Sequence, residues 1–275
     1  MKISISNIAW DTSEDGVIAS LLNRYDVGAI DIAPGKYFPD PGRATDQEIE
    51  RIKKWWAVRG IKIVGMQALL FGTVGLNIFA SLEVQEAMLL RLREVCRIAS
   101  GLGAKHLVFG SPKNRNCAGL SECEAMSVAV PFFRHLGEIA FSYGVVICVE
   151  PNPACYGANF MTNSAETLRV VKEVAHPAIK MQFDSGSLSI NHEDPKQVLQ
   201  DCASFIGHVH ISEPGMLPIG DGGVDHSTIA DYLERYLPNH TATIEMLETK
   251  NEPHPIAIER AIRATVQHYR KKGEV

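Results

Sequence analysis

The feature that most constrains the fold is a regular alternation of short apolar segments with amphipathic segments along the 275 residues. Short runs rich in Val and Ile, without a polar face, are typical of parallel strands covered by helices. Eight runs fit this description: Ile3–Ser6, Ala29–Ile32, Lys62–Met66, His106–Phe109, Val145–Glu150, Ile179–Asp184, His208–Ile211 and Thr243–Met246. Strands that alternate with helices form right-handed crossovers and a parallel sheet.

Several of the intervening segments repeat their apolar residues with the period of a helix. The predicted helices are Ser81–Ala99, one that opens at Asn163, one that opens at Asp194, His226–Leu237 and Pro255–Lys271. Asn163 and Asp194 are residue types that cap helix N-termini, and Ser81 is a third start signal. Gly101 is the expected stop signal of the first of these helices.

Eight fairly regular strand–helix units predict a single (β/α)8 TIM barrel, a parallel eight-stranded fold for which 275 residues is a usual length. An open, doubly wound sheet is the alternative, and fewer strands would suit it better. Its dinucleotide-binding form also needs G-x-G-x-x-G after the first strand, which this chain lacks. Gly220–Gly223 comes late and predicts a loop. No linker rich in Pro or Ser divides the chain, so we predict one domain over residues 1–275.

The charge balance limits the partners of the chain. Its 27 Lys and Arg against 32 Asp and Glu give a net charge of −5, which argues against a nucleic-acid-binding surface. The six cysteines form no C-x-x-C pair. The N-terminal residues alternate like a strand, and no apolar run is long enough to cross a bilayer. We therefore expect a cytoplasmic protein with reduced thiols, no nucleic-acid partner and no membrane.

Four strong metal-ligand side chains stand at the ends of four successive late strands. They are Glu150, Asp184, His210 and Glu245, at intervals of 34, 26 and 35 residues, each about one strand–helix unit. In a barrel of this kind the carboxyl ends of the strands open into one mouth. Three carboxylates and an imidazole suit one divalent cation, with Mn²⁺ expected first and Mg²⁺, Co²⁺ or Zn²⁺ as alternatives. A single such residue is more often a cap or an ion-pair partner.

The sequence also resembles a known family, the xylose isomerase-like barrels, and within it sugar isomerases and epimerases of the D-tagatose 3-epimerase type. The resemblance covers nearly the whole chain. Its carriers are Met66–Gly72, Phe109–Arg115, Val149–Asn152, Phe183–Gly186, His208–Glu213, Gly220–Asp225 and Thr243–Glu245. It implies a sugar or sugar phosphate substrate and assembly as a dimer or tetramer.

The resemblance further implies proton transfer between two metal-binding glutamates, which match Glu150 and Glu245 here. One would remove the proton beside the carbonyl of an open-chain sugar, and the other would return one. A carboxylate is a weak base for such a proton, so the metal must stabilise the enediolate. Return from the opposite face gives epimerisation, and return to the neighbouring carbon gives aldose–ketose isomerisation.

Two departures from the family pattern concern substrate contacts. Ser187 stands where those epimerases carry a histidine, and Glu213–Gly220 contains no arginine. Other candidates for the substrate site are Lys113 and Arg115 after the fourth strand, Glu213 as a partner of His210, and Trp10 as a wall of the sugar pocket. Each has an alternative without a role in function. Lys113 and Arg115 could be a pair of loop charges with no ligand, Glu213 a surface carboxylate, and Trp10 a core or interface residue.

Four other functions differ from the isomerase in the residues or the reaction that they would require. A keto-cyclitol-type dehydratase, a lyase, would use the same metal and the same proton abstraction. An AP-endonuclease-like phosphodiesterase would need histidines at the ends of the third and fourth strands, where Gln67 and Gly110 stand. A non-catalytic sugar-binding barrel would not need two opposed glutamates. A Schiff-base aldolase would need a lysine at a late strand end.

Overall fold

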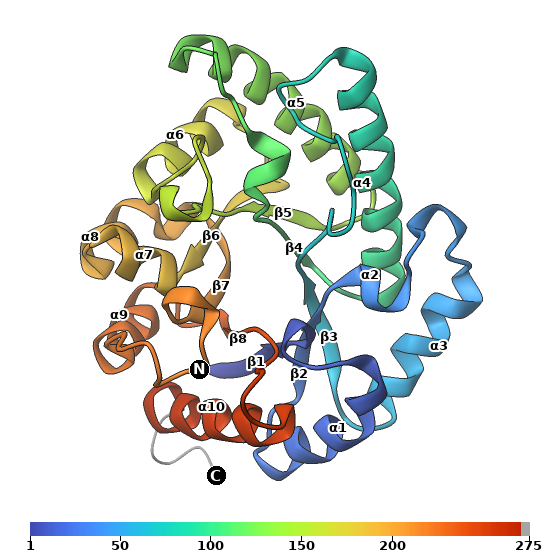
Figure 1. Cartoon of the computed structure of the whole chain (residues 1–275), viewed down its shortest axis with the longest axis vertical. Coiled ribbons are helices and arrows are strands. Elements are labelled where there is room, and N and C mark those ends of the chain that lie inside the picture. Colours follow the sequence, from blue (N-terminus) through green and yellow to red (C-terminus); the bar gives the residue numbers. More distant parts are fainter. Residues whose placement is uncertain (271–275) are drawn as a thin grey trace.

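Over residues 1–270, the part of the chain that the computed structural model describes, eight strands form a closed barrel inside a ring of helices (Figure 1). The strands are β1 (Lys2–Ser6), β2 (Ala29–Ile32), β3 (Lys62–Met66), β4 (His106–Phe109), β5 (Val146–Val149), β6 (Ile179–Asp184), β7 (Ile206–Ser212) and β8 (Thr241–Glu245). They follow the sequence order, every neighbouring pair is parallel, and β1 pairs with β8 to close the barrel. The predicted (β/α)8 barrel is confirmed.

Helices surround this barrel and cover the outer face of its strands (Figure 1). They are α1 (Asp15–Arg24), α2 (Pro34–Tyr37), α3 (Asp46–Ala57), α4 (Leu82–Leu102), α5 (Glu122–Ser142), α6 (Ser164–Val174), α7 (Ser185–Asn191), α8 (Pro195–Cys202), α9 (His226–Tyr236) and α10 (His254–Tyr269). The apolar core between the two layers contains fully buried aromatic side chains such as Trp56 and Phe133 beside many Ile, Leu and Val residues. None of the helices in residues 1–270 has the length and apolar character that a bilayer crossing requires.

The predicted element ends differ from the observed ones in a few places. Gly101 does not stop α4, because the helix continues through it to Leu102. Gly103 ends the helix instead, with φ of 87°, a left-handed conformation that favours glycine. Strand β5 ends at Val149, so Glu150 is the first residue after it. The last helix begins at His254 and ends at Tyr269, and its predicted end at Lys271 lies outside the described residues.

The inside of the barrel is polar near the mouth. Asp31 of β2 and His208 of β7 come from strands that are not neighbours, yet their side chains meet at 2.6 Å, so the contact runs across the interior. His106 of β4 stacks on His208, with ring centroids 5.4 Å apart. These three side chains, two imidazoles and one carboxylate, come from strand positions that face inward. This polar column lies directly below the residues of the mouth.

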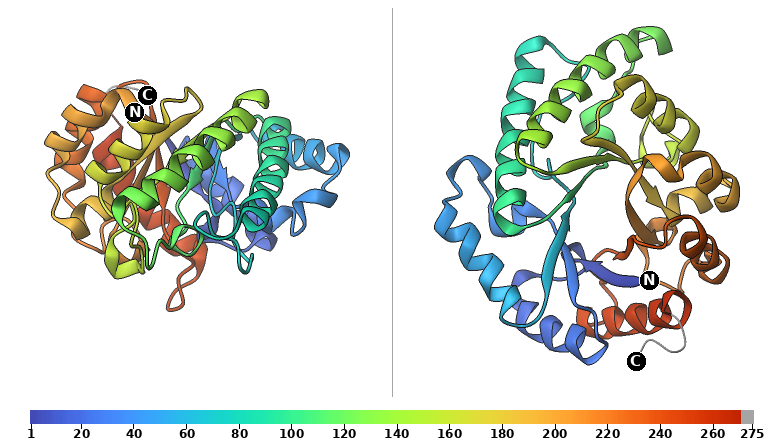
Figure 2. Two further views of the ribbon diagram at one scale, coloured as in Figure 1. Left: turned by 90° about the horizontal axis from the view of Figure 1, so that it is seen from above. Right: turned by 180° about the vertical axis from the view of Figure 1, so that it is seen from behind.

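The two faces of the barrel have different roles. The N-terminus and the end of α10 lie on one face, and the loops that follow the carboxyl ends of the strands gather on the opposite face (Figure 2, left). The amino group of Met1 donates to the carbonyl of Tyr269 at 2.8 Å, which joins the two ends of the described chain. The face away from the termini is therefore the one on which strand-end residues meet. That one domain covers residues 1–275 stays a prediction.

The predicted cap of α6 provides a test of local stability. The Asn163 side chain accepts from the backbone N–H of Glu166 at 2.9 Å and donates to its carboxylate. Replacement of Asn163 by Ala leaves that N–H without its partner, so the free energy of unfolding should fall by about 1 kcal/mol. Urea denaturation measures the change. Asn163→Ser keeps a hydrogen-bond acceptor, so its free energy of unfolding should fall by only a few tenths of the loss in Asn163→Ala. Equal losses in the two variants would contradict the capping role.

Candidate metal centre

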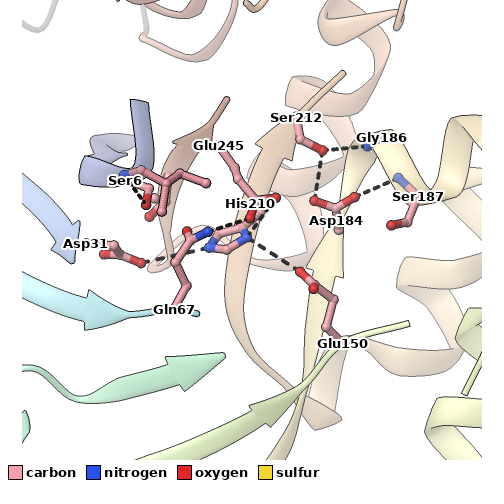
Figure 3. A network of polar contacts seen from close by, with 12 residues as sticks. Ser6, Asp31, Gln67, Glu150, Asp184, Gly186, Ser187, His210, Ser212 and Glu245 are labelled. Carbon is pink, nitrogen blue, oxygen red and sulfur yellow. Dashed lines mark hydrogen bonds and ion pairs between the residues drawn. The ribbon is translucent and has the colours of Figure 1, made fainter. Parts of the chain in front are cut away.

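The structure brings the four predicted ligand residues together at the mouth of the barrel. Glu150 follows β5, Asp184 ends β6, His210 lies in β7 and Glu245 ends β8. One ligand atom of each lies within 4.8 Å of the corresponding atoms of the others, and all four residues are buried. Glu150 and Glu245 converge on the His210 ring from β5 and β8 (Figure 3). Four successive strands thus deliver one donor group each to the same point.

The Glu150 carboxylate is held at one oxygen and open at the other. Oε2 accepts from the Asn152 side-chain amide at 3.1 Å. Oε1 is buried without a hydrogen-bond partner and lies 3.6 Å from His210 Nδ1. The carboxylate packs against Gly110, where any Cβ atom would collide with Oε2. The absence of a side chain at Gly110 therefore makes room for Glu150.

Glu245 shows a similar arrangement on the other side of the imidazole. Its Oε1 accepts from the Gln67 side-chain amide at 2.7 Å. Its Oε2 lies 3.3 Å from His210 Nδ1. Each glutamate therefore has one oxygen fixed by a carboxamide N–H, while the other oxygen is directed at the cluster.

Asp184 is held more tightly than either glutamate. It is the N-cap of α7, so its Oδ1 accepts from the backbone N–H of Ser187 at 2.6 Å. Its Oδ2 accepts from the Ser212 hydroxyl at 2.8 Å (Figure 3). Both oxygens already have a donor, and this fixes the orientation of the carboxylate.

The electrostatics of the cluster fit a cation. Burial and the charges of Glu245 and Glu150 raise the pKa of Asp184 to about 7. Burial alone would lower the pKa of His210, but the charge of Glu245 and close contacts with Asp31, Glu150 and Glu245 outweigh it, so this pKa lies well above its usual value. Without a metal the cluster therefore retains protons that offset its negative charge. The unpartnered Glu150 Oε1 and this donor set suit a divalent ion.

Asp31, His208 and His106 lie inside the barrel below His210. Asp31 Oδ2 contacts His208 and lies 3.9 Å from His210 Nε2. Burial would raise the pKa of Asp31, but the charge of His208, the hydrogen bond to it and the nearby ring of His210 hold this pKa far below its usual value. Burial lowers the pKa of His106 to about 4, with the charge of His208 adding to the effect. Asp31 is therefore ionised and His106 neutral near pH 7.

A cavity of about 860 Å³ opens above the cluster, and three of the ligand residues, Glu150, Asp184 and Glu245, line it. Leu69, Leu70, Phe71, Met216 and Leu247 from three different loops contribute apolar walls. The basic residues of its lining are Lys36, Lys250 and His254. Lys36 pairs with Glu248 at 2.8 Å and His254 pairs with Glu14. A cavity of this size holds a small molecule.

The structure places two candidate substrate residues away from this cavity. The Trp10 side chain is fully buried and does not line the cavity, and its indole N–H donates to Asp15 at 2.8 Å. Trp10 is thus a core residue, because its polar atom finds a buried partner there. Lys113 is exposed, and it does not line the cavity either.

The other two candidates are buried but already have partners. Glu213 lines the cavity, but its oxygens accept from the backbone N–H groups of Gly220 and Val224 at 2.8 and 3.0 Å and contact His226 at 3.2 Å. It holds the following loop and has no contact with His210. Burial would raise its pKa, but these hydrogen bonds keep the pKa below its usual value. Arg115 is fully buried beside Asn152 and does not line the cavity.

Sequence reasoning did not assign roles to Gln67, Asn152 and Ser212, which hold the three carboxylates. Gln67 and Ser212 could have been found, since each stands at or just after a strand end, as the ligands do. Asn152 lies two residues beyond Glu150 in a loop, and no periodic pattern indicates its direction.

Comparison with known proteins identifies the family of this chain. The family model described as "Xylose isomerase-like TIM barrel" matches residues 20–272. The chain belongs to this family. No curated protein matches the sequence significantly.

Solved structures of other proteins share the barrel. One is the D-psicose 3-epimerase of Clostridium cellulolyticum H10 with D-tagatose (TM-score 0.81, 15% identity, covering 98% of this chain and 99% of that one). Another is the 3-keto-D-glucoside 4-epimerase of E. coli in its apo form (TM-score 0.78, 17% identity, covering 96% and 98%). A third is the IOLI protein with a zinc atom (TM-score 0.77, 17% identity, covering 100% of both chains). At these identities the likeness establishes the fold.

Metal binding to this xylose isomerase-like barrel should release protons. Asp184 with a pKa of about 7 and His210 with a raised pKa must both lose their protons to act as ligands. The affinity for Mn²⁺ should therefore rise between about pH 6 and pH 8. Titration calorimetry in buffers with different protonation enthalpies measures the released protons. A binding heat that does not depend on the buffer would contradict the expected protonation of the metal-free cluster.

A second test concerns the space beside Glu150. Gly110→Ala places a methyl group against Oε2 and should displace the carboxylate, weakening Mn²⁺ binding by about tenfold or more. The control is Gly16→Ala, because nothing lies within 4 Å of the added methyl group there. Calorimetry gives both affinities, and thermal unfolding shows whether each variant is folded. A folded Gly110→Ala protein with unchanged affinity would exclude Glu150 as a ligand.

Proposed function

We propose that this protein is a metal-dependent sugar isomerase or epimerase that interconverts ketoses by proton transfer at the carbon next to the carbonyl. One observation carries the proposal: Glu150 and Glu245 each keep one carboxylate oxygen directed at the cluster while an amide holds the other. Two glutamates that flank one cavity can serve a substrate from two sides. A metal-binding protein without catalysis has no need of this pair.

The family supports the same assignment. Two of the structures that share the fold are named as epimerases of a free or a modified sugar, and a third holds zinc. Epimerisation next to a carbonyl requires a base and an acid at the same carbon. Glu150 and Glu245 would supply them here, each from its own strand end.

A divalent ion, with Mn²⁺ as first choice, would be held by Glu150, Asp184, His210 and Glu245. When bound, it supplies the Lewis acidity that stabilises negative charge developing on the carbonyl oxygen. The protein residues do the rest. Asp184 has a donor at each oxygen and acts as a fixed ligand, whereas Glu150 and Glu245 hold and move the proton.

The cavity favours a sugar without a phosphate group. Among the described residues, no arginine lines it, and two of its three basic residues already pair with Glu248 and Glu14. Phosphate sites in proteins usually combine several donors or an arginine fork. Of the basic residues that line the cavity within residues 1–270, Lys250 is the one for which no ion pair is found, so we propose an uncharged ketose as the substrate. A ketose lacking a phosphate also suits the apolar walls formed by Leu69 and Met216.

Solvent-deuterium exchange tests the reaction. Enzyme stripped with chelator and restored with Mn²⁺, Mg²⁺ or Co²⁺ is incubated in D₂O with a panel of ketoses and their phosphates. Deuterium should appear beside the carbonyl only with metal, and the labelled carbon identifies the reaction. Loss of water with an enone absorbance would instead favour a dehydratase.

Two conservative variants test the roles of the glutamates. Glu150→Gln and Glu245→Gln each replace the carboxylate that would accept the proton by an amide that cannot act as a base. Each should lower the exchange rate at least about 100-fold, the usual contribution of a general base. Thermal unfolding should show that both remain folded. Near-normal exchange in either variant would contradict the two-glutamate mechanism.

A further inference from the structure

The two amides that hold the glutamates differ in how firmly they are held themselves. Gln67 Nε2 donates to Glu245, but Gln67 Oε1 is buried without a partner. Asn152 Nδ2 donates to Glu150, and Asn152 Oδ1 accepts from Arg115 Nη2 at 2.6 Å. The amide beside Glu150 is therefore fixed at both ends, and the amide beside Glu245 at one end.

Arg115 is an unusual residue for this position. It ends a short 3-10 helix (Pro112–Arg115) after β4 and is fully buried. Nη2 donates to Asn152, while Nε and Nη1 are buried and find no hydrogen-bond partner within residues 1–270. Burial lowers the pKa of the guanidinium to about 10, although the charge of Glu150 counteracts this. A buried cation with unmet donors costs stability, so its presence calls for another benefit.

A guanidinium donates hydrogen bonds and accepts none. Next to Arg115, the Asn152 amide must therefore present its oxygen to the arginine and its NH₂ group to Glu150. Without Arg115 the amide is free to rotate, and in the reversed orientation its oxygen would face the Glu150 carboxylate. The orientation of Asn152 thus decides whether Glu150 Oε2 is held, which in turn decides where Oε1 lies.

We propose that Arg115 is a positioning residue for Glu150: it acts through Asn152, which holds Glu150 Oε2 and directs Oε1 to the ligand cluster. The inference rests on the proposed metal-dependent function. It gives Arg115 a role different from the substrate contact expected from the sequence, because the side chain does not line the cavity.

The sign of one measurement separates this role from a purely electrostatic one. Arg115→Met removes a positive charge near the cluster. Loss of the Coulomb repulsion between this charge and a metal ion would by itself strengthen the binding of a cation. Loss of positioning instead weakens it, and residues that orient metal ligands typically contribute about 10- to 100-fold in affinity. We therefore expect Mn²⁺ affinity, measured by calorimetry, to fall by that factor in Arg115→Met.

A double-variant cycle tests whether Arg115 acts through Asn152. Asn152→Leu should weaken Mn²⁺ binding to a similar extent, and adding Arg115→Met to it should cause no further loss. The Co²⁺ absorption spectrum should change in both single variants, since the geometry of Glu150 changes. Arg51→Met makes the same substitution at an exposed site on α3 and should leave affinity and spectrum unchanged.

Thermal unfolding of the metal-free proteins completes the experiment. Arg115→Met should unfold at the wild-type temperature or above, since a buried cation with unmet donors is removed. Arg115→Leu, which also lacks a donor, replaces it in the cycle if the Met variant does not fold, and failure of both to fold would show a structural role and overturn the proposal. Unchanged or tighter binding in a folded variant, or additive losses in the double variant, would also overturn it. If the wild-type protein binds no metal, the proposed function itself fails.

Discussion

Repulsion among three carboxylates gathered in a buried mouth is the constraint on which the rest of this structure depends. Glu150, Asp184 and Glu245 lie around one imidazole, and burial together with their mutual charges raises the pKa of Asp184 to about 7. Such a cluster is stable only with protons or a cation to offset it. Closure of the barrel makes the cluster possible, because β5 to β8 are successive parallel strands whose carboxyl ends open on one face.

Polar groups below the mouth support this arrangement where most barrels of comparable size would place apolar side chains. Asp31 and His208 meet across the interior at 2.6 Å, and His106 stacks on His208. A buried charge is tolerated when it is paired and hydrogen-bonded, as Asp31 is here. Asp31 and the two histidines thus continue the polar cluster from His210 into the barrel, and the mouth is the top layer of a polar interior.

The strands and the four cluster residues could be predicted because both follow from period and spacing. A parallel strand shows as an apolar run, and one strand–helix unit has a nearly constant length, so strand-end side chains must meet. The surroundings of Trp10, Lys113 and Glu213 could not be predicted, because loop side chains are directed by tertiary hydrogen bonds. Glu213, for example, turns towards the N–H groups of Gly220 and Val224. The predicted helix end at Gly101 was wrong for a related reason. A glycine ends a helix in this way where the chain adopts the left-handed conformation, and here that residue is Gly103.

The hydrogen bonds around the two glutamates hold the Glu150 carboxylate more firmly than the Glu245 carboxylate. A base must lie within about 3 Å of the proton that it takes, and must keep this position while the substrate changes shape. In the proposed reaction Glu150 would meet the first demand through Asn152, which donates to its carboxylate and accepts from Arg115. Glu245 depends on Gln67, whose second polar atom has no partner and whose amide can therefore adjust. The mouth of this barrel therefore holds one glutamate through an amide with two partners and the other through an amide with one.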